Sequence, residues 1–203
     1  EVTIDLSKFN ERSMRNVLNQ TYRKGYDGLC LKYRDAPQLE ILRDLIRETL
    51  RGFEIVREEK NLCVVENISD PTEDKFELVL RRLFLTIKQE AEESVQDLIA
   101  GKHDPSRSRK VKNTVDNYTN LLRRLVIKFQ IKGSRDSYLM YHLVAFLSYI
   151  HHAYFYLYQL HLPAPSKETA KLLQETLILY QNFYTAFYQQ DLEMAHSIGI
   201  AKS

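Results

Sequence analysis

Hydrophobic side chains follow two different periods in the first third of the chain. Residues 2–6 carry an apolar side chain at every second position, which is typical of a half-buried strand. Apolar side chains recur every third or fourth residue over 11–23 and 36–50, which predicts two amphipathic helices. Shorter apolar runs predict three further strands, at 28–33, 53–56 and 62–66. The predicted order is β-α-β-α-β-β, and right-handed crossovers place both helices on one face of a small sheet.

From residue 72 onward the apolar period is that of helices throughout. The predicted helices span 72–100, 106–131, 138–162 and 166–190, and a fifth begins at 192. We therefore predict an α+β fold in which an α+β sandwich domain, 1–69, precedes an antiparallel helical bundle, 70–203. The linker between them is expected around Asp70–Pro71.

The stretch 138–162 contains no Asp, Glu, Lys or Arg, although 28% of the chain is charged. A helix that is apolar around most of its circumference is buried in protein or lies in lipid. This stretch also carries Ser148 and four histidines, and polar groups are costly in the core of a bilayer. We therefore expect the central helix of a soluble bundle, and no membrane span.

The bulk composition narrows the classes of function. The net charge of +2 and the pI of about 8.4 are too balanced to predict nucleic-acid binding by themselves. Cys30 and Cys63 lie among apolar residues, as buried cysteines of a reducing compartment do. The first residues, EVTIDLSKFN, have neither a basic start nor an apolar run, so we expect a cytoplasmic protein without a signal peptide. A first residue of Glu1 favours a natural N-terminus further upstream.

No motif in the sequence predicts catalysis. The chain has no Gly-rich phosphate loop, no CxxC, no HExxH and no Ser-His-Asp spacing. We therefore predict that the protein is not an enzyme.

Three segments of the helical part carry a resemblance to a known family. ENISDPTEDKFELVLRRLFLTIKQEAEESVQDL resembles the start of the PhoU domain in archaeal phosphate-uptake regulators. YHLVAFLSYIHHAYFYL is similar to the third helix of that domain, and AFYQQDLEMAHSI to the start of its second three-helix repeat. The resemblance implies a PhoU-like bundle and a regulator of phosphate transport that acts by binding proteins.

The family resemblance extends to the segment before the bundle. Many archaeal members have a β-α-β-α-β-β segment there, which 1–69 resembles, and an AbrB-like DNA-binding domain before it. We expect this chain to lack the AbrB-like part and to hold an incomplete second repeat.

The resemblance also implies a site. Members of the family carry paired acidic residues four positions apart on adjacent helices, where they share a helix face and chelate several iron or zinc ions. The matching positions here are Lys112 and Asp116 on one helix, and Ser148 and His152 on the next. Because only Asp116 keeps its acid, we expect no multinuclear cluster and no cofactor. Two alternatives stay open: a single zinc or iron on Asp116 and His152, or side chains that only form hydrogen bonds in the protein.

Two further groups of side chains are candidates for binding. A basic run at the start of a helix, where positive charge is unfavourable against the macrodipole, favours an anionic partner or a solvated face. It consists of Arg107, Arg109, Lys110 and Lys112. A tyrosine ladder with a spacing of four residues favours either core packing or a surface for a partner. It consists of Tyr180, Tyr184 and Tyr188.

We therefore predict a regulator of phosphate uptake or phosphate signalling. Its expected partners are phosphate-transport or phosphate-signalling proteins and further copies of the same chain, and nucleic acid is not expected from this chain alone. One alternative is a metal-binding helical bundle or enzyme that uses Asp116 and the histidines. Another is a transcriptional regulator that binds nucleic acid through residues 107–112, with a steep dependence on salt.

Overall fold

The computed structural model describes residues 1–69, 72–73, 75–131, 133–160 and 165–200. The predicted linker at Asp70–Pro71 and the histidine at position 161 lie outside these residues. The chain divides into two compact units, Glu1–Leu80 with Asn117–Ala145 and Arg81–Asp116 with Phe146–Ser203. The predicted boundary between residues 69 and 70 concerns independent folding, and it stays a prediction.

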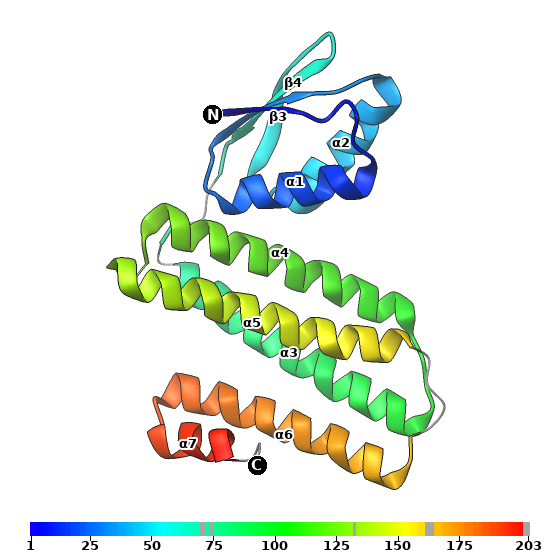
Figure 1. Cartoon of the computed structure of the whole chain (residues 1–203), viewed down its shortest axis with the longest axis vertical. Helices are drawn as coiled ribbons and strands as arrows, with labels where there is room; N and C mark the ends of the chain where they lie inside the picture. The colour runs from blue at the N-terminus through cyan, green and yellow to red at the C-terminus, as the bar shows by residue number, and fades with distance from the viewer. Residues whose placement is uncertain (70–71, 74, 132, 161–164, 201–203) are drawn as a thin grey trace. The chain divides into compact units, whose positions relative to one another are not determined.

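The first unit contains the predicted sheet, and the order β-α-β-α-β-β is confirmed (Figure 1). The sheet part of this unit consists of β1 (Val2–Asp5), α1 (Glu11–Arg23), β2 (Gly28–Lys32), α2 (Ala36–Thr49), β3 (Phe53–Glu59) and β4 (Leu62–Asn67). The strands lie in the order β1-β2-β4-β3. β1 is parallel to β2, whereas β4 is antiparallel to both of its neighbours. The sheet is therefore mixed, and the fold class α+β is confirmed.

Local capping residues begin α1 and α2, and both helices begin where the sequence predicted. The Asn10 side chain accepts from the Ser13 amide at 2.9 Å, and the Asp35 side chain accepts from the Gln38 amide at 3.0 Å. Both helices lie on one side of the sheet (Figure 1), as expected from the crossovers. Their apolar faces and the facing strand residues form one core, which includes Leu18, Leu42, Leu29, Leu31 and Val65.

Gly52 makes the turn between α2 and β3. Its φ of +84° lies in the left-handed region that residues with a Cβ rarely adopt. A Cβ at this position would lie 2.2 Å from the carbonyl oxygen of Ser69, so the backbone leaves no room for a side chain. The Ile68 amide donates to the Gly52 carbonyl at 2.7 Å, which ties the end of β4 to this turn.

Arg124, on the α4 helix (Pro105–Phe129), joins the helical part of the first unit to the sheet part. Its side chain is fully buried, and its guanidinium donates to the Tyr26 carbonyl at 2.7 Å and to Asp27 Oδ1 at 2.6 Å. The guanidinium also lies 5.0 Å from the ring centre of Tyr22 and 4.9 Å from that of Phe53. Sequence patterns did not identify this buried arginine, because its partners lie about a hundred residues earlier in the chain.

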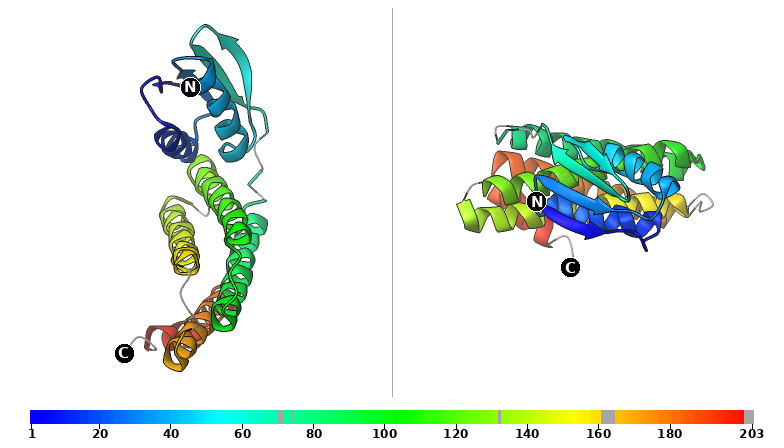
Figure 2. Two further views of the ribbon diagram at one scale, coloured as in Figure 1. Left: turned by 90° about the vertical axis from the view of Figure 1, so that its right-hand side faces the viewer. Right: turned by 90° about the horizontal axis from the view of Figure 1, so that it is seen from above.

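The second unit is helical. It contains parts of α3 (Lys75–Ala100), α4 and α5 (Gly133–Gln159), together with α6 (Lys167–Gln189) and α7 (Leu192–Ile200). α7 packs against α6 (Figure 1 and Figure 2). The Ser166 side chain caps α6, with the Thr169 amide donating to it at 3.2 Å. No helix in the described part of the chain is both long and apolar enough to cross a membrane.

The start of the central helix was predicted too late. The prediction placed it at residue 138, but α5 already begins at Gly133. The predicted helix followed the stretch without charged residues, whereas the first turn of α5 includes the charged Asp136. α4 ends at Phe129, and the next residue, Gln130, has a left-handed φ of 45°.

Candidate functional site

Asp116 lies at the centre of a small polar cluster in the second unit. Lys112 Nζ, one turn earlier on α4, lies 2.5 Å from Asp116 Oδ2. His152 Nε2, on α5, lies 3.0 Å from Asp116 Oδ1, so its N–H donates to the carboxylate. Three of the four positions matched to the acidic motif are therefore in direct hydrogen-bond contact.

The cluster stabilises the ionised form of Asp116. Burial by itself raises the pKa of this carboxyl, but the hydrogen bonds from His152 and Lys112 outweigh it, and the pKa lies below its usual value. The side chains of all three residues are between 23% and 32% exposed, so the cluster is reachable from solvent. Both carboxylate oxygens already accept from a nitrogen of the protein.

The neighbours of His152 on α5 are buried. Ser148, the fourth matched position, is buried one turn before His152. His151 is fully buried, and among the described residues neither of its ring nitrogens has a hydrogen-bond partner. Burial lowers the pKa of His151 to about 4, and the nearby His152 acts in the same direction. His151 is therefore neutral at pH 7.

These residues do not fit a multinuclear metal cluster. Bridged cations need several anionic oxygens, and the four positions supply one carboxylate, one imidazole, one hydroxyl and one ammonium. The Lys112 ammonium already lies against the oxygen that a second cation would need. Within the described residues, no group of three or more His, Cys, Asp or Glu side chains could hold an ion.

Arg107 is held inside the second unit instead of facing an external anion. Its guanidinium pairs with Glu93 and, at 3.0 Å, with Asp97, both on α3. It also lies 5.8 Å from the ring centre of Tyr158, whose hydroxyl donates to Asp97 at 3.0 Å. Its own amide donates to Asp104 Oδ1 at 3.0 Å, which caps the start of α4. Internal carboxylates therefore offset the unfavourable charge at this helix start.

The predicted basic run does not converge on one site. Arg107 and Lys112 pair with carboxylates of the second unit, whereas Arg109 and Lys110 are exposed. In the part of the chain that the structure describes, neither of these two exposed side chains has an ion-pair partner. Anion binding by the run stays a prediction, and the exposed pair is the part that a ligand could reach.

The acidic partners of Arg107 were not predicted from the sequence. Glu90, Glu93 and Asp97 follow one another at spacings of three and four residues, so they share one face of α3. That spacing was a usable signal, because a row of carboxylates beside a predicted apolar stripe needs a cationic partner. The pairing across helices could not be read from the sequence, since it depends on how α3 and α4 pack.

The tyrosine ladder packs within the second unit. The ring centre of Phe84, on α3, lies within 6.4 Å of the ring centres of five aromatic residues of α6: Tyr180, Phe183, Tyr184, Phe187 and Tyr188. Tyr180 is buried, and its hydroxyl donates to the Phe84 carbonyl at 2.9 Å. A partner could contact only the half-buried Tyr184 and Tyr188, for which an interface role stays a prediction.

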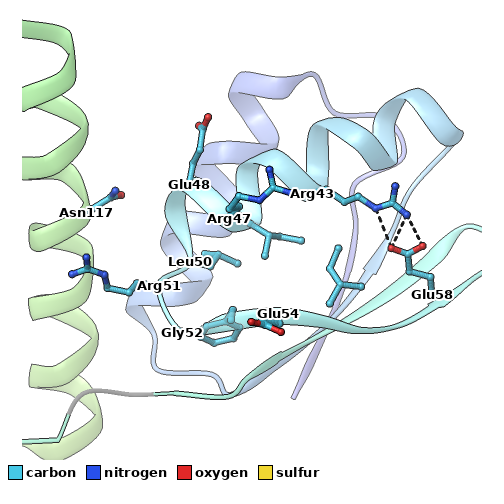
Figure 3. A pocket seen from close by; sticks show the side chains of 12 residues that line it. Arg43, Arg47, Glu48, Leu50, Arg51, Gly52, Glu54, Glu58 and Asn117 are labelled. Atoms are coloured by element: carbon cyan, nitrogen blue, oxygen red, sulfur yellow. Dashed lines mark hydrogen bonds and ion pairs between the residues drawn. The ribbon is translucent and has the colours of Figure 1, made fainter. Parts of the chain in front are cut away.

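A hollow of about 580 Å³ lies beside α2 and β3 in the first unit (Figure 3). Its charged lining consists of three arginines and three glutamates: Arg43, Arg47, Arg51, Glu48, Glu54 and Glu58. Arg43 and Glu58 form a bidentate pair, with Nη2 2.7 Å from Oε2 and 2.8 Å from Oε1. Because these charges cancel, the lining favours neither an anion nor a cation.

This chain matches no protein-family model, no curated protein and no solved structure. The Asp116 cluster is therefore the candidate site on its geometry and on the family resemblance of its surrounding segments.

Proposed function

We propose that this chain is a regulatory module of phosphate uptake that acts by binding other proteins and not by catalysis. The resemblance to PhoU-type regulators supplies the biological role. One structural observation supports carrying it over: positions matched to an acidic motif on two separate helices, Asp116 and His152, are in contact at 3.0 Å. A chance match of short segments would not be expected to bring these positions together.

The chemistry of the cluster favours a role without a metal cluster. Where the motif of the family supplies carboxylates, this chain supplies an ammonium at Lys112 and an imidazole at His152. Two unit charges about 4 Å apart interact by roughly 4 kcal/mol at an effective dielectric constant of about 20, so replacing an acid by a base changes the site's affinity for cations strongly. We infer that the module transmits its signal through contacts of its helices.

The proposal is tested by phosphate uptake in cells. A strain that lacks this gene is compared with strains complemented by the parent chain, by Asp116→Ala and by Asp44→Ala, a matched control on an exposed ion pair. We expect loss of the gene to change the uptake rate of labelled phosphate, and the parent and Asp44→Ala chains to restore it. Uptake that is identical in all four strains would refute a role in phosphate regulation.

The proposal that the module works without a metal cluster is tested on the purified chain. We expect elemental analysis of protein prepared without chelators to give fewer than two iron or zinc ions per chain. Two or more ions per chain that are lost in Asp116→Ala, but kept in Asp44→Ala, would contradict this part of the proposal.

A mononuclear zinc or iron site is the second candidate, and the contact between Asp116 and His152 favours it. A metal there would displace Lys112 from the carboxylate, and water would have to complete the coordination. One metal per chain, lost equally in Asp116→Ala and in His152→Ala, would favour this alternative. Binding of the metal would also raise the melting temperature of the parent chain.

A further inference from the structure

α5 has two apolar faces, and the described residues cover only one of them. The covered face consists of Val144, Leu147, His151, Tyr154, Phe155 and Tyr158. The opposite face, which we call the α5 seam, is exposed at every position: Leu139, His142, Phe146, Tyr149, Ala153, Tyr156 and Leu160. The absence of charge along this stretch, which suggested a fully buried helix, therefore belongs in part to an outward-facing surface.

The spacing of the α5 seam is that of a coiled coil. Successive seam positions are alternately three and four residues apart over three heptads, which brings a row of side chains along one line of the helix. α5 is helical to Gln159, and the Leu160 amide continues the pattern by donating to the Tyr156 carbonyl at 3.2 Å. Half-buried Leu143, Ile150 and Leu157 flank the row and widen its apolar surface. Such a surface fits a second helix with the same spacing.

The α5 seam is complementary to itself when its direction is reversed. If two copies of α5 run antiparallel with Tyr149 facing Tyr149, Leu139 lies opposite Leu160. The same register sets the large Phe146 opposite the small Ala153, which leaves a space for the ring. It also sets His142 opposite Tyr156, so an imidazole nitrogen can accept from a hydroxyl. A parallel pair would instead set Phe146 against Phe146 and His142 against His142.

The area of the α5 seam is enough for a dimer. Phe146, Tyr149 and Tyr156 are 60%, 63% and 60% exposed, and the terminal leucines, Leu139 and Leu160, are 54% and 66% exposed. With aromatic side chains that bury about 150–250 Å² each, the seam offers about 500 Å² per chain. A pair of seams would bury about 1,000 Å², which is the lower limit for a specific interface, and the flanking leucines and isoleucine add to it.

We propose that the α5 seam is a dimer interface, in which the α5 helices of two copies of this chain pack antiparallel about a two-fold axis at Tyr149. A two-fold axis places the same surface on both copies, which is the arrangement that a self-complementary row requires. No charged residue lies between positions 137 and 166, so the pairing brings no like charges together. The dimer interface is independent of a role in phosphate uptake.

Sedimentation equilibrium on the full chain tests the interface. The parent is expected to be a dimer at micromolar concentration. Tyr149→Glu places an unpaired charge on the axis from both copies, and we expect it to weaken the dimer about a hundredfold. Leu172→Glu, on the 59% exposed Leu172 of α6, adds the same charge outside the seam and should leave the dimer unchanged. Circular dichroism and melting confirm that each variant is folded.

Disulfide trapping tests the direction. In a background of Cys30→Ser and Cys63→Ala, which removes both native thiols, Leu139→Cys and Leu160→Cys chains are mixed and oxidised. Antiparallel packing predicts that the mixed disulfide forms much faster than either homodimer. A parallel pair would instead give Leu139→Cys homodimers.

Three results would overturn the proposal. A parent chain that is monomeric at tens of micromolar has no such interface. A dimer that survives Tyr149→Glu but dissociates in Leu172→Glu uses α6 instead. A monomeric parent that binds vesicles of neutral phospholipid, and loses this binding in Tyr149→Glu, uses the seam on a lipid surface.

Discussion

Acidification should destabilise the second unit through His151. The ring is fully buried, and its nitrogens have no hydrogen-bond partner within the described residues, so nothing there stabilises the imidazolium. Its pKa in the folded chain is about 4, against an ordinary value of 6.5. A histidine with a lowered folded pKa binds its proton more tightly when the chain is unfolded. Stability is therefore fully present above pH 6.5 and is lost as the pH falls toward 4.

The size of the effect follows from the difference in pKa. One pKa unit corresponds to about 1.4 kcal/mol, so the complete loss between pH 6.5 and pH 4 is about 3 kcal/mol. Between pH 7.5 and pH 5.0 the free energy of unfolding should fall by about 2 kcal/mol from this residue alone. For a chain of this length, that corresponds to a fall in melting temperature of about 4–8 °C.

The charged neighbours of His151 define the window in which the measurement is clean. His152 and Lys112 disfavour its protonation, whereas Asp116 favours it. The lowered pKa of Asp116 also makes stability fall with pH, but only below its unfolded value near 4. A measurement that stays above pH 5.0 therefore reports His151 with little contribution from Asp116.

The assay is denaturant unfolding at pH 7.5, 6.5, 5.5 and 5.0 for three chains at one protein concentration. These are the parent, His151→Leu and His196→Leu, which removes an exposed histidine of the same unit. We expect His151→Leu to match or exceed the stability of the parent at pH 7.5, because it removes two unpaired nitrogens. The variant should also keep that stability at pH 5.0, while His196→Leu falls as the parent does.

Equal losses of stability in the parent and in His151→Leu between pH 7.5 and pH 5.0 would show that His151 does not cause the pH dependence. A His151→Leu chain that is several kcal/mol less stable than the parent at pH 7.5 would contradict an unpaired ring. The second result would mean that the ring has partners that stabilise it.

Three further changes have expected outcomes. Arg124→Ala should lower the free energy of unfolding by about 2–5 kcal/mol, because it empties a fully buried site and removes the donor to the Tyr22 and Tyr26 carbonyls; denaturant unfolding measures this loss. Gly52→Ala should lower the free energy of unfolding by at least about 2 kcal/mol, because of the left-handed φ and the close contact of a Cβ with the Ser69 carbonyl. Gly101→Ala should lower it by about half as much, because φ is +65° there but a Cβ would meet no atom within 4 Å. Burial raises the pKa of Glu90 above its value in the unfolded chain, so the parent loses stability as the pH rises through the raised pKa. In denaturant unfolding between pH 5 and pH 8, the free energy of unfolding should fall less for Glu90→Gln than for the parent.

The secondary structure of this protein is largely readable from short stretches of sequence. Asn10, Asp35 and Ser166 cap helices by bonds to amides three residues away, and such local signals need no knowledge of the rest of the chain. The order β-α-β-α-β-β follows from hydrophobic period for the same reason. The start of α5 was predicted too late because the prediction followed the apolar stretch without charged residues that begins at Tyr138, whereas α5 begins five residues earlier at Gly133.

The partners of the charged side chains depend on packing between distant segments. Arg124 pairs with Asp27 across nearly a hundred positions, and Arg107 is enclosed by two carboxylates of another helix. A run of basic residues looks the same in sequence whether it faces solvent or an internal acid. The matched positions on α4 and α5 were identified from the sequence, but their contact at 3.0 Å was not.

The outer face of α5 shows this limit most clearly. Its sequence is apolar on all sides, and hydrophobic period alone predicts burial all round. Which side is covered depends on where the neighbouring helices lie, and in the described residues they cover the face of Val144 and Leu147 while Phe146 and Tyr149 stay exposed. Apolar residues make association favourable without specifying a partner, because the hydrophobic effect has no direction. Only the folded arrangement of the helices leaves the α5 seam available to a second chain.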